Sequence, residues 1–423
     1  MTGAVITGVG SVCALGSGID ALFDGLAAAR SCIAPVASFD ARSFDTRVAC
    51  EVMAGAPDLG WIRSQIEVEA GSAAALERYS ERGAWRDRKC AFALVAASQA
   101  WRMAGCGAAD AGAALVVALG LEQAFLDDFG PLFGADGIDW STPRPPGIRI
   151  RSDVDLSARL IADVLGLRGP VIVNASACAA GGLALAHAAS LVERGAAEVV
   201  LCGGADSMVN PFGLGGMSRL GAPSPRNEAD ACRPFDRRRD GLVIGEGAAM
   251  FVVESQARAE RRGARILARV LGYGSTQDAY RVTAPRPDGL AARMAMEKAL
   301  QRSGLPPAAI GYVNAHGTGT PLNDVAEARA IRAAFGDHDV PVSSVKGAIG
   351  HLMAASGAIE AAVCLLPFAR GLLPGTAHHR DKDPLCEVDV IGEQPRAAEV
   401  QAVLSNSFGF GGQNVSLVLG RPH

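Results

Sequence analysis

A cysteine stands where an apolar segment gives way to small residues, in VNASACAAGG at residues 173–182. The valines before it are typical of a buried strand, and the alanine-rich stretch after it is typical of a helix. We therefore expect Cys178 at the N-terminus of that helix, where unpaired backbone N–H groups and the helix dipole favour a thiolate. Its small neighbours leave room for a bulky substrate, so Cys178 is a candidate nucleophile. The alternative is a buried structural cysteine.

Two histidines lie in glycine-rich segments near apolar strands. His316 belongs to VNAHGTGTPLND at residues 313–324, and His351 belongs to SVKGAIGHLMAASGAIE at residues 344–360. A histidine at a strand end stands where α/β enzymes keep their chemistry. The alternatives are a structural histidine in a turn for His316 and a helix cap for His351.

Four charged residues accompany these histidines. Lys346 lies five residues before His351, and Glu360 lies nine residues after it, inside an apolar helix where a carboxylate needs a partner. The alternative for Lys346 is a surface position. Asp324 and Glu327 have the spacing of a capping box for the helix that follows His316.

A glycine-rich segment, SNSFGFGGQN at residues 405–414, interrupts an otherwise apolar strand. Such glycines indicate a bulge or a close approach between backbones. A backbone N–H near Phe410 is therefore a candidate donor to an oxyanion.

Composition limits the possible functions. The chain has 423 residues, of which 49% are hydrophobic, and a formal net charge of −4. This charge gives no global attraction to nucleic acid or membranes. No basic region precedes the N-terminal apolar run, and the apolar stretches look shorter than the ~20 residues of a membrane span. We expect a cytoplasmic protein without a membrane span or a nucleic-acid partner.

Several familiar motifs are missing. None of the ten cysteines forms a CxxC pair, which argues against a disulfide framework and a zinc site. The segment VITGVGSVCALG has Gly-x-Gly after a strand but lacks the third glycine of a dinucleotide fingerprint. The motifs GxxxxGK[ST], HExxH and GxSxG are also absent, so nucleotide-binding, zinc-protease and serine-hydrolase functions are rejected.

The elements that must position these residues alternate between strand and helix. Strands are expected at residues 4–10, 114–120, 170–176, 198–204, 248–255, 310–317, 341–345, 402–408 and 414–420. Helices are expected at residues 21–30, 89–105, 155–167, 180–195, 289–304, 324–336 and 356–371. This alternation favours a layered α/β architecture with mostly parallel, buried strands. The second half echoes the first, with a seam near residues 255–265.

Taken together, the four glycine-rich or small-residue segments resemble the β-ketoacyl-ACP synthases of the thiolase superfamily, most closely the synthase II type and the polyketide ketosynthases. Residues 203–220 and 233–255 match the same family, and the segments occur in the family's order along nearly the whole chain. The resemblance implies a five-layer αβαβα fold made of two similar halves. It implies an N-terminal half at residues 1–258 with the nucleophile, and a C-terminal half at residues 259–423 with both histidines.

The resemblance also implies a reaction, a decarboxylative Claisen condensation of an acyl thioester with malonyl-ACP. Cys178 is implied to carry the acyl group as a thioester. His316 and His351 are implied to assist the loss of CO2 and to stabilise the enolate, for which each ring needs its proton on the nitrogen facing the substrate. Lys346 and Glu360 match the supporting charged residues.

Further residues match the family's binding features. The backbone N–H groups of Cys178 and Phe410 match the oxyanion hole, and Phe410 also resembles the gate between the acyl pocket and the malonyl site. Thr318 and Thr320 match residues that hold the phosphopantetheine arm. Three residues match the monovalent-cation site of some relatives: Asn314, Glu360 and Asn406.

The resemblance implies no cofactor, because the phosphopantetheine arrives on an acyl carrier protein. Carrier proteins are acidic, so their docking site should be basic. The segment RYSERGAWRDRK at residues 78–89 lies where relatives keep such a patch; its basic residues are Arg78, Arg82, Arg86, Arg88 and Lys89. The alternative is an ordinary solvated helix face. The family is usually dimeric, so the second partner is another copy or a related ketosynthase or chain-length factor.

The sequence departs from the family at two places. Leu121, Glu122 and Gln123 replace a glycine-rich turn beside the acyl pocket, and Asp155 stands where relatives often have asparagine. Chain length and pathway (fatty-acid, polyene or polyketide elongation) therefore stay open.

Two other functions were weighed. A chain-length factor, a non-catalytic subunit, typically lacks the nucleophilic cysteine that is present here. A biosynthetic thiolase needs a second cysteine in the C-terminal glycine-rich loop, and SNSFGFGG has none.

Overall fold

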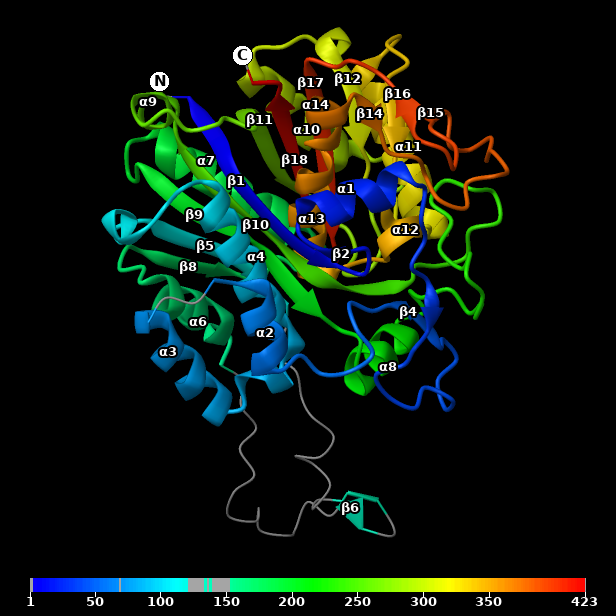
Figure 1. The fold of residues 1–423 in the computed structure, drawn as a ribbon. Coiled ribbons are helices and arrows are strands. Elements are labelled where there is room, and N and C mark those ends of the chain that lie inside the picture. Colours follow the sequence, from blue (N-terminus) through cyan, green and yellow to red (C-terminus); the bar gives the residue numbers. More distant parts are fainter. Residues whose placement is uncertain (1–2, 68–69, 121–132, 135–136, 139–152, 423) are drawn as a thin grey trace.

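A computed structural model describes residues 3–67, 70–120, 133–134, 137–138 and 153–422 (Figure 1). The predicted departure at Leu121, Glu122 and Gln123 lies outside the described residues. Asp155 lies within them, at the N-terminal end of α6 (Leu156–Leu165).

The strands and helices are those of a large α/β protein. The principal strands are β1 (Ala4–Cys13), β4 (Val48–Cys50), β5 (Ala114–Leu119), β8 (Val171–Asn174), β9 (Val199–Ser207), β10 (Ile244–Ser255), β11 (Ala268–Gln277), β12 (Ile310–Asn314), β13 (Pro341–Ser343), β15 (Asp389–Val390), β17 (Ala402–Gly409) and β18 (Gln413–Gly420). The principal helices are α1 (Ile19–Ala27), α2 (Leu59–Gln65), α3 (Ala70–Glu81), α4 (Arg88–Met103), α6, α7 (Ala180–Glu193), α8 (Pro211–Arg219), α9 (Gln256–Arg261), α10 (Leu290–Ser303), α11 (Pro321–Phe335), α12 (Lys346–Ile349), α13 (Ser356–Val363) and α14 (Leu366–Arg370).

The main sheet repeats one arrangement of strands twice. Its order is β15-β13-β12-β17-β18-β11-β1-β10-β9-β5-β8. In the N-terminal half β5 pairs parallel with β8 and β9, and then β9, β10 and β1 pair antiparallel. In the C-terminal half β12 pairs parallel with β13 and β17, and then β17, β18 and β11 pair antiparallel. The duplication inferred from the sequence therefore extends to strand order and direction, whereas the expectation of mostly parallel strands was wrong.

Helices cover this sheet in layers. The helix α4 packs on β1, β10 and β9, and α10 packs on β11 and β18 in the corresponding place of the other half. The helices α7 and α13 contact each other and strands of both halves, so they form the middle layer. Figure 1 shows the two halves side by side, with α4 and α6 over the N-terminal strands. This arrangement has the five αβαβα layers that the resemblance implies.

Pairs of glycines let each outer helix approach its strand. A Cβ atom on Gly8 or Gly10 of β1 would lie 2.1 Å from a carbonyl oxygen of α4. A Cβ atom on Gly272 or Gly274 of β11 would lie 2.2 or 2.1 Å from a carbonyl oxygen of α10. The Gly-x-Gly after the first strand segment therefore serves helix packing rather than nucleotide binding.

Some expected elements differ from those observed. The helix expected at residues 324–336 begins at Pro321, three residues earlier. The helix expected at 356–371 divides into α13 and α14, with Pro367 in the first turn of α14. The strand β11 was not predicted, because its glycines and polar residues weaken the period-2 pattern.

One helical run of the described residues, Met353–Arg370, is long and apolar enough to cross a membrane by length and composition. It is longer than the apolar stretches expected from the sequence. Of this run, 83% is buried inside the fold, and α13 lies in the middle layer, as a core helix does.

Candidate active site

The turn between β8 and α7 presents Cys178. A short 3-10 turn, Ala177–Ala179, joins the strand to the helix, and Ala177 has a φ of +47°. A positive φ at alanine is a strained conformation that is typical of functional turns. The cysteine therefore lies at the strand-to-helix turn, as expected, in an apolar cluster that includes Met217 and Met353.

The glycine-rich loop after β17 approaches the backbone of this turn. A Cβ atom on Gly409 would lie 3.2 Å from the backbone nitrogens of Cys178 and Ala179. The Phe410 backbone forms a hydrogen bond with the Cys178 thiol. The close approach predicted from the glycines is thus present, and it brings together the two backbone N–H groups expected to stabilise an oxyanion.

The thiol of Cys178 is not an easily formed thiolate. Burial raises its pKa to about 12, and the opposing effects of the Lys346 charge and the Phe410 backbone hydrogen bond are smaller. The expectation that the start of the helix makes this sulfur anionic is therefore wrong for the free protein. Desolvation is the largest effect on this thiol, because an apolar surrounding penalises the charged form.

His316 lies just after β12 and is held by Lys346. The Lys346 Nζ atom lies 3.2 Å from Nδ1 of His316 and 2.6 Å from its carbonyl oxygen. Lys346 also forms a buried ion pair with Glu360. Burial, and then the charge of Lys346 and the nearby His351, hold the pKa of His316 well below its ordinary value. The ring is therefore neutral at neutral pH.

His351 follows Gly350 and precedes the turn that leads into α13. Its Nδ1 atom lies 2.8 Å from the Ser356 hydroxyl and accepts the backbone N–H of Met353 at 3.1 Å. Because Nδ1 accepts, the proton of the neutral ring is on Nε2. Burial, and then the charge of Lys346, hold the pKa of His351 well below its ordinary value.

The nucleophile candidate and both rings share one cavity. The His316 and His351 ring centroids lie 5.3 Å apart in an edge-to-face arrangement. A cavity of about 390 Å³ is lined by Cys178, both histidines and Phe410. Residues far apart in the sequence therefore meet around one space of a size that holds a substrate.

The threonines predicted to hold the pantetheine arm line the same cavity. The hydroxyls of Thr318 and Thr320 lie 2.9 Å apart. Toward its mouth the cavity is lined by exposed apolar side chains, with exposures of 54% for Leu220, 76% for Val282 and 64% for Leu322. A partly apolar entrance with a polar pair inside suits a long flexible arm with amide groups.

Two carboxylates of α11 hold the loop that carries His316. Glu327 accepts the backbone N–H groups of His316 and Gly317, at 2.8 and 2.7 Å. Asp324 accepts those of Phe235 at 2.8 Å and Gly319 at 3.2 Å. Their spacing was interpreted as a capping box, but the helix begins at residue 321, so these carboxylates lie inside it and face the loop.

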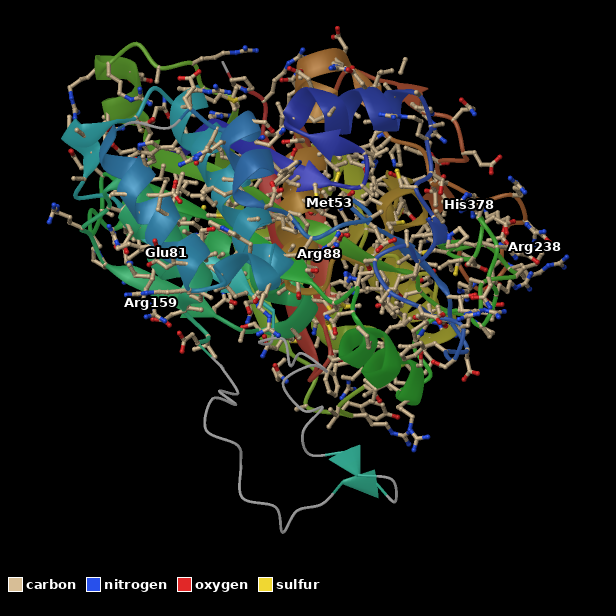
Figure 2. The ribbon with its side chains drawn as sticks, turned by 60° about the horizontal axis from the view of Figure 1, so that its bottom comes forward. Met53, Glu81, Arg88, Arg159, Arg238 and His378 are labelled. Atoms are coloured by element: carbon tan, nitrogen blue, oxygen red, sulfur yellow. The ribbon has the colours of Figure 1, made fainter. Side chains whose placement is uncertain are left out.

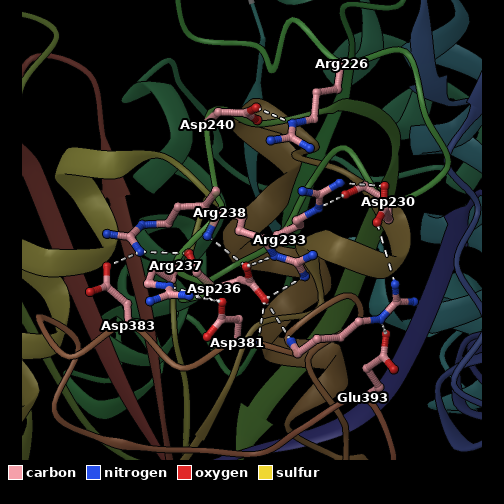
Figure 3. Close-up of polar contacts among 12 residues, drawn as sticks. Arg226, Asp230, Arg233, Asp236, Arg237, Arg238, Asp240, Asp381, Asp383 and Glu393 are labelled. Atoms are coloured by element: carbon pink, nitrogen blue, oxygen red, sulfur yellow. Dashed lines mark hydrogen bonds and ion pairs between the residues drawn. The ribbon is translucent and has the colours of Figure 1, made fainter.

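An arginine–aspartate network joins segment 233–240 to the loop at residues 380–383 (Figure 3). Asp236 accepts hydrogen bonds from two backbone N–H groups of that loop, both at 2.8 Å. Arg239 bonds to the same loop and lies 3.7 Å from Asp324. The segment that resembles the family therefore braces the His316 loop, and its residues Asp240 and Leu242 line the cavity.

The predicted cation site has few free oxygens. The unpaired polar atoms there are Oε2 of Glu360 and Nδ2 of Asn314, and the latter is a donor. The Asn406 side chain is engaged with Glu327 and Ser416, at 3.2 and 2.8 Å. As oriented, these side chains do not fit a cation.

Two of the predicted docking residues are buried. Arg88 is 7% exposed and forms an ion pair with Glu246. In Figure 2 it lies beside Met53, and it donates a hydrogen bond of 2.6 Å to the Met53 carbonyl oxygen. Lys89 is 1% exposed and pairs with Asp87. Because α4 begins here, these two residues turn into the core, and their assignment to a docking surface was wrong.

The other basic residues of the same segment, Arg78, Arg82 and Arg86, are exposed. They lie in or just after α3, before the chain turns into the core. A smaller basic surface therefore remains.

Comparison with known proteins identifies similar chains. The family models "Beta-ketoacyl synthase, N-terminal domain" and "Beta-ketoacyl synthase, C-terminal domain" match residues 2–259 and 267–380. The 3-oxoacyl-[acyl-carrier-protein] synthase 2 of Synechocystis is 36% identical over 98% of this chain and 96% of its own. The oxytetracycline polyketide putative beta-ketoacyl synthase 1 of Streptomyces rimosus is 37% identical over 99% of this chain and 97% of its own.

Solved structures are similar along the whole chain. The ishigamide ketosynthase/chain length factor has a TM-score of 0.84 at 32% identity, with full coverage of both chains. A type II polyketide ketosynthase in complex with its acyl-carrier protein has a TM-score of 0.84 at 26% identity, also with full coverage of both.

Proposed function

The chain belongs to the β-ketoacyl synthase family, and from this premise we propose how its own residues carry out the condensation. It is an acyltransferase that joins an acyl thioester to the malonyl group of a carrier with loss of CO2. The enzyme needs no cofactor of its own, because the carrier brings the phosphopantetheine. The observation that carries the residue assignment is the single cavity lined by Cys178, His316 and His351.

In the first step Cys178 accepts the acyl group. Its sulfur attacks the thioester carbonyl, a carbon–sulfur bond forms, and the bond to the carrier's sulfur breaks. The thiol proton ends on the departing pantetheine sulfur, so the exchange is balanced. The backbone N–H groups of Cys178 and Phe410 stabilise the negative oxygen of the intermediate. Since the thiol pKa is raised to about 12, sulfur deprotonation must accompany the attack rather than precede it.

In the second step the two histidines favour loss of CO2. The carbon–carbon bond of the malonyl group breaks, and its electron pair forms the enolate of the carrier thioester. The Nε2–H groups of His316 and His351 donate to the developing oxygen anion. Donors placed in a site shielded from water contribute ~3 kcal/mol each to such a transition state.

In the third step the enolate carbon attacks the acyl group held on Cys178. A new carbon–carbon bond forms, the bond to the Cys178 sulfur breaks, and the departing thiolate takes a proton from water. The product is a 3-oxoacyl group on the carrier. The residues of the predicted cation site do not fit a cation, so no step is routed through one.

The test supplies acyl-ACP and malonyl-ACP to the purified protein and to Cys178→Ala. We expect a 3-oxoacyl product and an acyl mass adduct with the first, and neither with the second. Failure of the wild-type protein to form product with carriers of every chain length tested would falsify the proposal. An adduct that persists in Cys178→Ala would move the nucleophile to another residue.

An acyl carrier protein is the proposed partner. A similar solved structure is a ketosynthase in complex with such a carrier. We propose that Arg82 and Arg86, which are exposed, contribute to the docking surface. Replacing both by glutamate should raise KM for the carrier at low salt and leave kcat with a pantetheine substrate unchanged. An unchanged KM would move the docking surface elsewhere.

The proposed assembly is a dimer, with a second copy or with a related ketosynthase or chain-length factor. The strand β8 lies at the edge of the main sheet and exposes Val171 and Ile172, 47% and 37%. An exposed apolar edge strand is a surface that pairs readily with another strand. A similar structure is described as a ketosynthase/chain length factor. Light scattering of the purified chain, alone, decides between a self-paired dimer and a monomer awaiting a partner.

We place this enzyme in the cytoplasm, in fatty-acid, polyene or polyketide elongation. The similar proteins named above belong to fatty-acid and polyketide synthesis. Intact-mass measurement of the acyl chains that load on Cys178, from a panel of carriers, separates these pathways.

A further inference from the structure

A buried carboxylate contacts the turn that follows His351. Asp206 lies near the end of β9 and is 2% exposed. Its Oδ2 atom accepts the backbone N–H of Ala354 at 2.9 Å, and its Oδ1 atom accepts the backbone N–H of Ser207 at 2.8 Å. A buried carboxylate has to be held by donors, and here one donor belongs to the catalytic segment.

The turn itself has an unusual backbone. Leu352 has φ −85° and ψ 22°, in the bridge region beside the helical one, whereas Met353 has a φ of +46°. Successive right- and left-handed residues direct neighbouring N–H groups to one side and form an anion-binding concavity. The Met353 N–H donates to Nδ1 of His351, and the next N–H, that of Ala354, donates to Asp206. A non-glycine residue at positive φ persists only where its surroundings hold it.

Packing leaves the carboxylate and the turn little freedom. A Cβ atom on Gly120 would lie 2.1 Å from Oδ1 of Asp206. Cβ atoms on Gly204 and Gly181 would lie 2.9 and 3.1 Å from the carbonyl oxygen of Ala354. Asp206 is therefore confined between the end of β5 and the turn, and the turn is confined between β9 and α7.

The charge state of the carboxylate suits this role. Burial raises the pKa of Asp206 to about 6, against the lowering by the Ala354 backbone hydrogen bond and the charge of Lys89. The group is therefore ionised at pH 7 to 8. The charge of Asp87, which pairs with Lys89, raises this pKa further.

We propose that Asp206 is a positioning residue for His351. Its carboxylate accepts the N–H of Ala354 and so stabilises the left-handed turn at Met353. This turn keeps the Met353 N–H directed at Nδ1 of His351. The proton of that ring thereby stays on Nε2, where it faces the cavity. The inference rests on the proposed function of His351 in the loss of CO2, and it assigns Asp206 no contact with substrate.

If Asp206 positions His351, its removal should slow one of the two steps and not the other. Acyl transfer to Cys178 uses backbone N–H groups of another loop, whereas loss of CO2 uses the His351 donor. Removing the Asp206 anchor should slow the second step and leave the first. A carboxylate that only stabilises the fold would reduce both steps in proportion to the folded fraction.

The experiment compares wild type with Asp206→Ala and Asp206→Asn. Acyl loading is followed by intact mass, CO2 release from malonyl-ACP is measured per acylated enzyme, and thermal unfolding reports the folded fraction. We expect loading within about threefold of wild type, and CO2 release slower by about tenfold or more in Asp206→Ala. Asp206→Asn keeps an acceptor for the Ala354 N–H, so its rate of CO2 release should fall less than that of Asp206→Ala.

Two further variants keep the proposal testable if Asp206→Ala does not fold. Gly120→Ala places a Cβ atom against the carboxylate and should produce the same selective defect with Asp206 intact. Glu254→Gln is the matched control, because Glu254 is a fully buried carboxylate near the end of β10 that bonds to Thr7 at 2.5 Å. It should leave the ratio of CO2 release to loading unchanged.

A double variant tests whether Asp206 acts through His351 or through the stability of the whole fold. In a His351→Ala background, Asp206→Asn should add less than about a twofold further loss of CO2 release, because the residue it positions is gone. Equal CO2 release per acylated enzyme in wild type and Asp206→Ala, or a parallel loss of both steps, overturns the inference. Absence of CO2 release from the wild-type protein overturns the proposed function instead.

Discussion

The ammonium group of Lys346 lies 3.2 Å from Nδ1 of His316 and 2.6 Å from the carbonyl oxygen of the same residue. An ammonium group only donates, so Nδ1 accepts and the proton of the neutral ring is on Nε2. Lys346 therefore sets the tautomer of His316, and the Met353 N–H sets that of His351 from a separate turn. Both rings therefore carry their proton on Nε2, and both line the cavity.

Replacing Lys346 by methionine should uncouple the two half-reactions. The variant keeps the length of the side chain but loses the donor to His316, so the ring is free to adopt the other tautomer. We expect CO2 release to fall by about 100-fold or more, while acyl loading stays within several-fold of wild type. Isotope-labelled malonyl-ACP and intact mass measure the two steps. Because Glu360 loses its buried partner, thermal unfolding gives the folded fraction, and equal losses of both steps per folded enzyme would contradict the selective role.

Alkylation of the free enzyme should report a protonated Cys178. Since burial raises the thiol pKa to about 12, the rate of iodoacetamide inactivation should rise about tenfold per pH unit, without a plateau between pH 6 and 9. Cys178→Ala, labelled in parallel, gives the background from other cysteines. A plateau below pH 8 would show that the sulfur ionises easily after all.

Loss of CO2 should persist into acidic conditions. The pKa values of His316 and His351 are held well below 6.5 by burial first, so both rings stay neutral as the pH falls through 6.5. The rate should decline only when the pH reaches the lowered pKa values and the rings gain charge. CO2 release per acylated enzyme, measured from pH 8 to pH 5, checks this. A decline centred at 6.5 would mean that the rings are more solvated than the structure has them.

Gly409→Ala should damage the oxyanion site. The added Cβ atom would lie 3.2 Å from the backbone nitrogens of Cys178 and Ala179, so the loop or the turn must move apart. We expect acyl loading to slow by about 100-fold, as for loss of one donor. Gly112→Ala, whose Cβ atom meets nothing within 4 Å, is the control. Loading at the wild-type rate would place the oxyanion donors elsewhere.

Substitutions of Arg88 and Arg86 should have different effects on stability. Arg88→Ala leaves Glu246 buried without its ion pair, which costs about 3–5 kcal/mol of unfolding free energy. Arg86→Glu changes an exposed side chain and should leave stability within about 0.5 kcal/mol. Urea unfolding measures both. A stable Arg88→Ala variant with a raised KM for the carrier would restore Arg88 to the docking surface.

Much of the site was readable from the sequence because its chemistry depends on local pattern. Glycines around Phe410 marked a close backbone approach, and small residues around Cys178 marked a strand-to-helix turn; both features are present. The βα alternation and the echo between the halves also appear, down to matching glycine pairs against α4 and α10. Such features follow from periodicity and from the space that a side chain requires, and both can be deduced from the amino-acid sequence.

Other features were decided only by tertiary structure. Whether Arg88 and Lys89 face solvent or the core depends on where α4 begins against the sheet. Whether Cys178 is a thiolate depends on how much apolar surface closes over it, and that burial comes from distant segments. Asp206 shows no local signal at all, because its partner Ala354 lies 148 residues away. Electrostatic energies and hydrogen bonds act through space, so only the folded chain determines them.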